Sequence, residues 1–363
     1  MRFAKNKILK RFIYKSGKDN IMYNINKEIF IREEENGITV YNVVTNVYKF
    51  YENLKLQGYF SKNKKLEKEQ FEKFLQDNKN TISTNINVKY PFRINWLVSD
   101  VCNLDCIYCC ANNKMDPKKI DREVLKKTAE HMITSLFPLT VGLTGGEPTL
   151  CPEIGNIIDI LDGKCAIVLD TNGTTPNFAS YIEKFKKSNT TVRITIDSMD
   201  NEISNKVRPY KENQVDLIKQ NIELLKKNNV RVSIHTVVTK INKDSIIEIG
   251  KYISNCKIEK WQLYPVNYSE RCKDYFDDIK VSDEELEELE KELQKEFGDK
   301  VLIRVYRNQV DFRANGVIFA DTKGEFYTDT IFNGVNIIGK NPSAQELIEK
   351  TNVENHIKDY LFN

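Results

Sequence analysis

The chain of 363 residues has no run of about 18 consecutive apolar residues, which argues against a transmembrane helix and a membrane partner. Its basic start, Met1 to Lys7, lacks the apolar segment of a secretory signal peptide, so we expect a cytoplasmic protein. The 55 basic and 52 acidic residues leave a formal charge of only +3, which argues against a general nucleic-acid binder. Eight cysteines are too few for a disulfide-stapled secreted domain and suit a reducing compartment.

Three of these cysteines stand close together, and their spacing indicates a metal site. Cys102, Cys106 and Cys109 follow a C-x3-C-x2-C pattern. Three thiols ligate only three irons of a four-iron cubane, so the fourth iron stays open for a substrate or cosubstrate. Structural zinc, the rival interpretation, takes four ligands, usually as two separated pairs, and the sequence has no second C-x-x-C and no H-x3-H. We interpret Cys110 as a bystander thiol, because adjacent cysteines point in different directions.

A second motif lies downstream, where the apolar stretch that begins at Val141 ends in Gly145-Gly146-Glu147-Pro148. Paired glycines let a ligand approach main-chain carbonyls closely, and a carboxylate beside them suits a cationic amine. Taken alone, the motif is equally compatible with an ordinary turn between a strand and a loop.

Together the two motifs resemble those of the radical S-adenosylmethionine (SAM) enzymes, whose cluster loop is C-x3-C-x-aromatic-C and whose second strand ends in G-G-E-P. The resemblance runs from about Arg93 to Val266. It implies one 4Fe-4S cluster on Cys102, Cys106 and Cys109, with the open iron chelated by the amino and carboxylate groups of SAM. An external electron donor, flavodoxin or ferredoxin, would drive cleavage of SAM to a 5′-deoxyadenosyl radical that abstracts hydrogen.

The same resemblance implies SAM contacts at individual positions. Tyr108 matches the aromatic residue near the adenine, and Arg208 matches an arginine that pairs with the SAM carboxylate, a task that suits a guanidinium group. The alternative for Arg208 is a solvated surface arginine. Thr195 and Ser198 replace the usual serine and glycine of a Ser-Leu-Asp-Gly segment. The expected SAM-binding residues are Tyr108, Gly145, Gly146, Glu147, Asn172, Thr195, Asp197 and Arg208.

Short β-branched runs alternate with amphipathic helical stretches in this part of the chain. Such alternation predicts right-handed crossovers and a parallel sheet. Six strands suit an α/β fold, a partial (βα)6 TIM-like barrel with its site at the carboxyl ends of the strands. The predicted strands are 93–99, 141–144, 166–170, 191–197, 231–239 and 260–266, and the predicted helices are 121–135, 153–161, 178–187, 215–228 and 243–254.

Residues 1–88 form an N-terminal α+β module that does not follow the barrel pattern. A hairpin turn is expected at Asn36-Gly37, and helices are expected near 47–56 and 66–77. The module weakly resembles the leader-peptide recognition element of peptide-modifying radical SAM enzymes, which holds a precursor peptide as an added strand. A structural cap or an oligomerisation module is the alternative.

The barrel is expected to span residues 89–270, and residues 271–363 form a C-terminal extension. An acidic helix is expected over 282–297, and a hairpin over 317–329 together with the later segment 336–340 resembles the SPASM or twitch extension of peptide maturases. Thr328 stands where those proteins have a cluster-binding cysteine, and no cysteine follows Cys272. We therefore expect a cluster-free, twitch-like β-hairpin and helix extension.

Cys272 follows the last predicted barrel strand, between two cationic residues, on a loop expected to overhang the barrel mouth. Neighbouring cations lower the pKa of a thiol, and an exposed thiol can donate hydrogen to a substrate radical. Cys272 is therefore the candidate catalytic hydrogen donor, and an ordinary loop cysteine is the alternative. We interpret His235 as a core histidine, with a position pointing into the barrel as the alternative, and His131 and His356 as surface residues.

The resemblance implies a radical SAM enzyme that modifies a ribosomally made peptide by epimerisation or cross-link formation. One alternative is a radical SAM enzyme that acts on a small molecule, such as a nucleotide or a cofactor precursor. The other is an iron-sulfur binding protein without turnover, which the intact Gly-Gly-Glu strand end disfavours.

Overall fold

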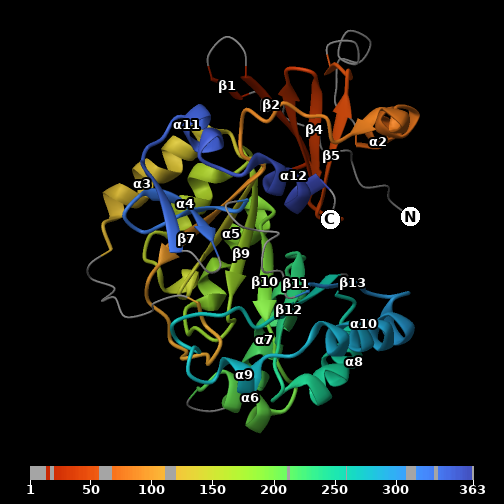
Figure 1. The fold of residues 1–363 in the computed structure, drawn as a ribbon, viewed down its shortest axis with the longest axis vertical. Coiled ribbons are helices and arrows are strands. Elements are labelled where there is room, and N and C mark those ends of the chain that lie inside the picture. The colour runs from red at the N-terminus through yellow and green to blue at the C-terminus, as the bar shows by residue number, and fades with distance from the viewer. Residues whose placement is uncertain are drawn as a thin grey trace.

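The computed structural model describes residues 14–16, 20–56, 68–110, 120–210, 213–258, 260–307, 316–330 and 334–361. Its centre is a ten-stranded sheet in the order β13-β12-β11-β10-β9-β8-β7-β14-β15-β16 (Figure 1). Neighbouring strands are parallel from β13 to β14, and the last two pairs are antiparallel. The strands are β7 (Arg93–Ser99), β8 (Thr140–Gly145), β9 (Ala166–Thr171), β10 (Thr191–Thr195), β11 (Val232–Val238), β12 (Lys260–Pro265), β13 (Leu302–Val305), β14 (Ile318–Ala320), β15 (Glu325–Thr330) and β16 (Gly334–Lys340).

Strands β7 to β12 are the six strands predicted for the barrel, and each pairs in parallel with the next, so the predicted α/β partial barrel is confirmed. Strand β13 extends the parallel run at one edge and was not predicted. The helices of this region are α3 (Arg122–His131), α4 (Ile154–Leu161), α5 (Ile182–Ser188), α6 (Asn201–Val207), α7 (Gln214–Lys227), α8 (Ile246–Asn255) and α9 (Phe276–Ile279).

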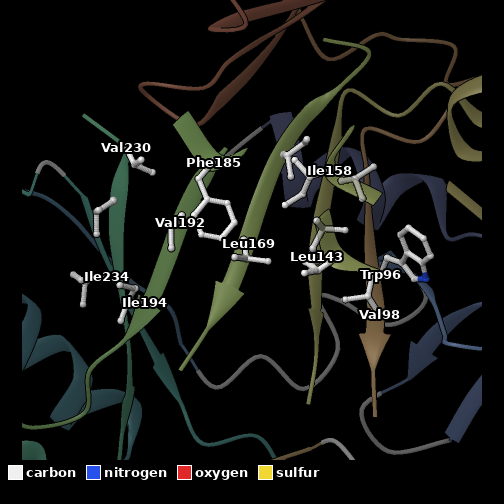
Figure 2. Close-up of a cluster of buried hydrophobic side chains, with 14 of the residues drawn as sticks. Trp96, Val98, Leu143, Ile158, Leu169, Phe185, Val192, Ile194, Val230 and Ile234 are labelled. Carbon is white, nitrogen blue, oxygen red and sulfur yellow. The ribbon is translucent and has the colours of Figure 1, made fainter. Parts of the chain in front are cut away.

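The barrel strands have one apolar face, which packs against the helices. Figure 2 shows Leu143, Leu169 and Ile194 on neighbouring strands, all within one buried cluster. Phe185 of α5 packs into the same cluster. Because successive side chains of a strand point to opposite faces, the residues between these positions face the barrel interior.

The N-terminal module is a six-stranded antiparallel sheet in the order β1-β2-β3-β4-β5-β6. The helix predicted near 66–77 is present as α2 (Lys68–Asp77), and residues 66 and 67 lie outside the described part. The helix predicted near 47–56 is wrong, because residues 47–52 form β5, whose Tyr48 and Phe50 are buried on one face in a period of two. The strands are β1 (Tyr14–Ser16), β2 (Asn20–Ile25), β3 (Ile29–Glu34), β4 (Gly37–Asn42), β5 (Val47–Glu52) and β6 (Ile82–Ser83).

This sheet covers the amino ends of the barrel strands, and α6 and α9 lie at the opposite end of the molecule (Figure 1). The Tyr48 hydroxyl donates to Oγ1 of Thr140 at 2.6 Å, where β8 begins. Nδ2 of Asn24 donates to the carbonyl of Gly163 at 2.6 Å, shortly before β9. The two parts share one apolar core, in which Phe30 and Phe50 of the module pack with residues of the barrel.

The C-terminal extension contains the expected helix as α10 (Asp283–Phe297), which begins with a capping box between Ser282 and Glu285, and the expected hairpin as β14 and β15. It ends in α11 (Ala344–Glu349) and α12 (Val353–Leu361). His356 on α12 is fully buried, stacks on Phe92 and accepts a hydrogen bond from its backbone N–H at 3.1 Å. The expectation of a surface position for His356 is therefore wrong. In the part of the chain that the structure describes, no helix is long and apolar enough to cross a membrane.

Candidate functional site

A cavity of about 560 Å³ extends from the loop that follows β7 into the barrel interior. It brings together eight of the residues that the sequence nominated, from five separate segments of the chain. Gly145, Glu147, Asp197 and Cys272 are not among the residues that line it. The nominated residues that do line it are Cys102, Cys106, Tyr108, Cys109, Gly146, Asn172, Thr195 and Arg208.

The two glycines at the end of β8 hold the start of the cluster loop by close backbone contact. The backbone N–H of Gly146 donates to the carbonyl of Ser99 at 2.6 Å. A Cβ atom at Gly145 would stand 2.3 Å from the carbonyl oxygen of Ser99, and one at Gly146 would stand 2.3 Å from that of Val101. Gly145 also has a φ of +127°, a conformation that other residues rarely adopt. Glycine at both positions therefore lets the loop pass tightly over the strand end.

The three thiols of the loop line the same cavity. Burial raises the pKa of Cys106 to about 12, so its thiolate form needs a positive partner such as a metal. Among the described residues, no three side chains of His, Cys, Asp or Glu are grouped to hold a single metal ion. A cubane does not need such convergence, because each thiol ligates a different iron, whereas zinc does. The donor set therefore fits a 4Fe-4S cluster.

Glu147 faces the protein interior instead of the cavity. Its side chain is fully buried, and Oε1 accepts hydrogen bonds from the backbone and the hydroxyl of Thr149 and from the hydroxyl of Thr171. Oε2 accepts from the backbone N–H of Asn172 at 2.8 Å. Burial raises the pKa of Glu147, and these hydrogen bonds oppose the rise. In this arrangement the carboxylate orders the strand ends next to the cavity.

A buried network lies below the cluster loop. The Tyr108 hydroxyl donates to Oδ2 of Asp197 at 2.5 Å, and the Nε atom of Arg208 lies 3.8 Å from the same oxygen. Arg208 donates to the carbonyls of Thr195 at 2.5 Å and Asn172 at 3.3 Å. Only 1% of Arg208 is exposed, so the alternative of a solvated surface arginine is wrong. Its Nε atom has no hydrogen-bond partner, which leaves one donor available near the cavity.

The expectation that Cys272 is an exposed thiol at the barrel mouth is wrong. The residue is fully buried and packs with Val266 and Ile279, because its loop folds back onto the cluster loop. The Tyr275 hydroxyl donates to the carbonyl of Ile107 at 2.9 Å, and Arg271 forms an ion pair with Asp105. The segment after β12 therefore supports the cluster loop, and the Cys272 thiol is not placed to reach a substrate in the cavity.

The structure also brings polar residues into the cavity that the sequence analysis did not nominate. They come from alternate positions of the barrel strands, where a polar residue follows an apolar one. His235 takes the alternative position considered for it: it lines the cavity, and its Nε2 atom is buried without a hydrogen-bond partner. Parallel strands buried on both faces are usually apolar throughout, whereas these strands alternate polar and apolar residues. This alternation was the signal in the sequence that could have indicated a polar barrel interior. The other residues of this kind are Arg93, Asn95, Asp170, Arg193, Gln262, Tyr264 and Arg304.

Comparisons with known proteins agree with this site. Residues 96–253 match the Radical SAM superfamily, which uses a 4Fe-4S cluster and SAM. The uncharacterized protein MJ0907 of Methanocaldococcus jannaschii is 34% identical over 165 residues, which are 43% of this chain and 56% of that protein. The S-adenosylmethionine-dependent nucleotide dehydratase of Flammeovirga pacifica is 25% identical over 250 residues, which are 65% of this chain and 82% of that protein. The match to MJ0907 thus spans little more than half of its length.

A solved structure with the same fold is that of Streptococcus suis SuiB bound to precursor peptide SuiA. The TM-score is 0.67 at 15% sequence identity, and the alignment covers 96% of this chain and 90% of that chain. At this identity the likeness concerns the fold. It extends beyond the residues that match the superfamily.

Proposed function

Because residues 96–253 form a radical SAM domain, we propose that this protein is an enzyme that abstracts hydrogen from a peptide substrate to modify it. The observation that supports this proposal is that the three cysteines of the C-x3-C-x2-C loop line one cavity together with Gly146, Asn172, Thr195 and Arg208. Cys102, Cys106 and Cys109 would hold the 4Fe-4S cluster. When bound, the cluster supplies the electron for reductive cleavage of SAM, which yields the hydrogen-abstracting 5′-deoxyadenosyl radical.

The residues of this chain would bind SAM and keep it in one orientation. The ring of Tyr108 would lie near the adenine, and the Nε atom of Arg208 would donate to the SAM carboxylate. Asp197 would act indirectly, since it holds both Tyr108 and Arg208. Glu147 would position Asn172, whose side chain donates to the Sγ atom of Cys102 at 3.8 Å. A flavodoxin or ferredoxin would supply the electron that reduces the cluster.

A peptide substrate is supported by the fold shared with SuiB, which has been seen with a precursor peptide. The cavity volume of about 560 Å³ lies in the range of small-molecule pockets, which suits SAM as a ligand. We assign residues 89–270 to the catalytic barrel, 271–363 to the extension and 1–88 to the N-terminal module. A leader peptide would add to the edge of the module sheet at β1, its outermost described strand on that side.

A second candidate is a small anionic substrate, and one observation favours it. The inner part of the cavity is lined by Arg93, Arg193 and Arg304 and by a single carboxylate among the described residues, Asp170. The nucleotide dehydratase of Flammeovirga pacifica is a relative that acts on such a molecule. In this case the N-terminal sheet would serve as a structural cap over the barrel.

An extract-fractionation experiment separates the two candidates. The reconstituted enzyme, SAM and dithionite are incubated anaerobically with fractions of a cell extract, and 5′-deoxyadenosine is measured by liquid chromatography. We expect a peptide fraction to stimulate 5′-deoxyadenosine formation and protease treatment to abolish the stimulation. Peptides encoded next to the gene are then tested singly for a change of mass. If the stimulation survives protease treatment and is found in the fraction with the smallest molecules, the peptide substrate is refuted and the second candidate is supported.

A further inference from the structure

The interior of this barrel is polar where TIM-like barrels are usually filled by layers of branched apolar side chains. Charged and polar residues of β7, β9, β10, β11, β12 and β13 line the inner part of the cavity. Two aromatic rings form part of its wall, since Tyr264 and Tyr306 stack with ring centres 4.3 Å apart. Both hydroxyls accept a hydrogen bond from Nε2 of Gln262 at 3.0 Å. The wall is thus ordered before any ligand binds.

Arg93 is the most informative residue of this inner part. Only 9% of it is exposed, its Nε atom donates to Oδ1 of Asn95 at 2.8 Å, and its Nη2 atom is buried without a hydrogen-bond partner. Room for its guanidinium comes from Gly142, where a Cβ atom would stand 2.3 Å from Nη2 of Arg93. Glycine inside a strand often marks a site of close approach. An unsatisfied guanidinium donor held over such a position is costly unless a ligand satisfies it.

The charges around Arg93 do not balance. Arg193 forms an ion pair with Asp170 through both oxygens, and Asp170 is the only carboxylate among the described residues that line the cavity. Arg93 and Arg304 therefore add positive charge with no acidic residue beside them in the cavity lining. Lys260, 8% exposed, lies behind this group, and burial together with the neighbouring arginines lowers its pKa to about 6. The potential of the inner cavity is positive, and it is partly screened from water.

We propose that Arg93, Arg193 and Arg304 form an anion subsite that binds a carboxylate or phosphate group of the substrate. Planar guanidinium groups pair with both kinds of anion through parallel hydrogen bonds. The stacked rings of Tyr264 and Tyr306 would then contact the part of the substrate between this anion and the cluster loop. The inference rests on the proposed function and narrows its substrate class: an acidic peptide residue, a peptide carboxyl terminus or a phosphorylated small molecule.

Calorimetric titration of the full-length reconstituted protein tests the anion subsite. The protein is saturated with SAM, so that its carboxylate site is filled, and inorganic phosphate and succinate are the probes. We expect saturable binding of at least one probe and an affinity about ten-fold or more lower in Arg93→Gln and Arg304→Gln, because each loses a charge-assisted hydrogen bond. The matched control is Arg122→Gln, an exposed arginine of α3 outside the cavity, which should bind as the wild type does.

The two probes distinguish the sources of the anion. Tighter binding of phosphate indicates a phosphorylated substrate, and tighter binding of succinate indicates a carboxylate. Absence of saturable binding to the wild type, wild-type affinity in Arg93→Gln and Arg304→Gln, or loss of binding on saturation with SAM would each overturn the anion subsite.

A further variant keeps the test valid if Arg93→Gln does not fold. Gly142→Ala retains every charge and displaces the ends of the Arg93 and Asn95 side chains, with no backbone atom among the nearest contacts, so it should fold and bind the probe more weakly than the wild type. SAM cleavage without substrate is measured in parallel. It should be unchanged in Arg122→Gln, whereas its absence in the wild type would refute the proposed function and not the subsite.

Discussion

The backbone N–H of Asn172 donates to Oε2 of the fully buried Glu147 at 2.8 Å. The side chain of Asn172 in turn donates to Sγ of Cys102 at 3.8 Å. The end of β8, the end of β9 and the first cysteine of the cluster loop are thus connected through one residue. This connection explains how a carboxylate outside the cavity affects the residues that line it.

Replacement of Glu147 by Gln should lower the free energy of unfolding by about 1–3 kcal/mol, because four buried donors face the carboxylate and an amide satisfies fewer of them. Chemical denaturation measures the loss. Thr171→Val, which removes one of the donors, serves as the comparison and should cost less. If Glu147 instead binds the SAM amine directly, Glu147→Gln would weaken SAM binding while stability stayed at the wild-type value.

The wild-type protein should hold about four irons per chain after anaerobic reconstitution, since it has one set of three thiols. The triple variant with Ala at Cys102, Cys106 and Cys109 should lose the iron and the cleavage of SAM. Cys110→Ala is the matched control, because this exposed thiol stands next to the set and should be dispensable. Iron analysis and the visible spectrum provide the measurement. Eight irons in the wild type, or loss of iron in Cys110→Ala, would contradict the assignment.

Tyr108→Phe should destabilise the protein by about 1.5–3 kcal/mol, because it removes a hydrogen bond to a buried carboxylate and leaves the ring in place. SAM affinity should fall less in Tyr108→Phe than in Tyr108→Leu if the ring lies near the adenine. Denaturation curves and equilibrium binding of SAM measure the two effects. Equal SAM affinity in both variants would remove Tyr108 from the expected SAM contacts.

The stability of the protein should depend on pH through Lys260. Burial and the charges of Arg193, Arg304 and Arg93 lower its pKa to about 6 in the folded state, while the unfolded chain has the ordinary value of about 10.4. Between these values the unfolded state binds one proton more, so stability rises with pH. Lys260→Met should be more stable than the wild type near neutral pH, and the difference should shrink as the pH rises to about 9. A difference that stays constant with pH, measured by urea denaturation, would show that Lys260 is charged in the folded protein.

Deletion of residues 1–88 should leave a barrel that aggregates or unfolds at a lower temperature. The deletion exposes a core that Phe30 and Phe50 share with the barrel, and large core truncations cost about 3–5 kcal/mol each. Tyr48→Phe is the mild comparison, because it removes only the hydrogen bond to Thr140. Thermal denaturation and light scattering provide the readout. A soluble truncated barrel that still cleaves SAM would show that the barrel does not need the shared core of the N-terminal module.

Local patterns in the sequence were sufficient for the cluster loop, the six barrel strands and the C-terminal hairpin. Ligand spacing and strand periodicity are properties of a few neighbouring residues, so they are readable without the fold. The helix predicted near 47–56 is wrong because contacts with distant residues, which a local pattern does not contain, determine the structure there. Val47–Glu52 has buried aromatic residues at a period of two, at Tyr48 and Phe50. Its pairing with β4 and its packing on the barrel core stabilise it as a strand.

The sequence by itself therefore determined the chemistry that the loop can support, because three thiols at that spacing leave one iron of a cubane open. Tertiary structure alone decided which side chains face the cavity. It buried Glu147 and Cys272 and placed Arg93 over Gly142 with a donor unsatisfied. The physical reason is that desolvation and charge balance depend on what lies against a side chain, and these neighbours come from segments far apart in the chain.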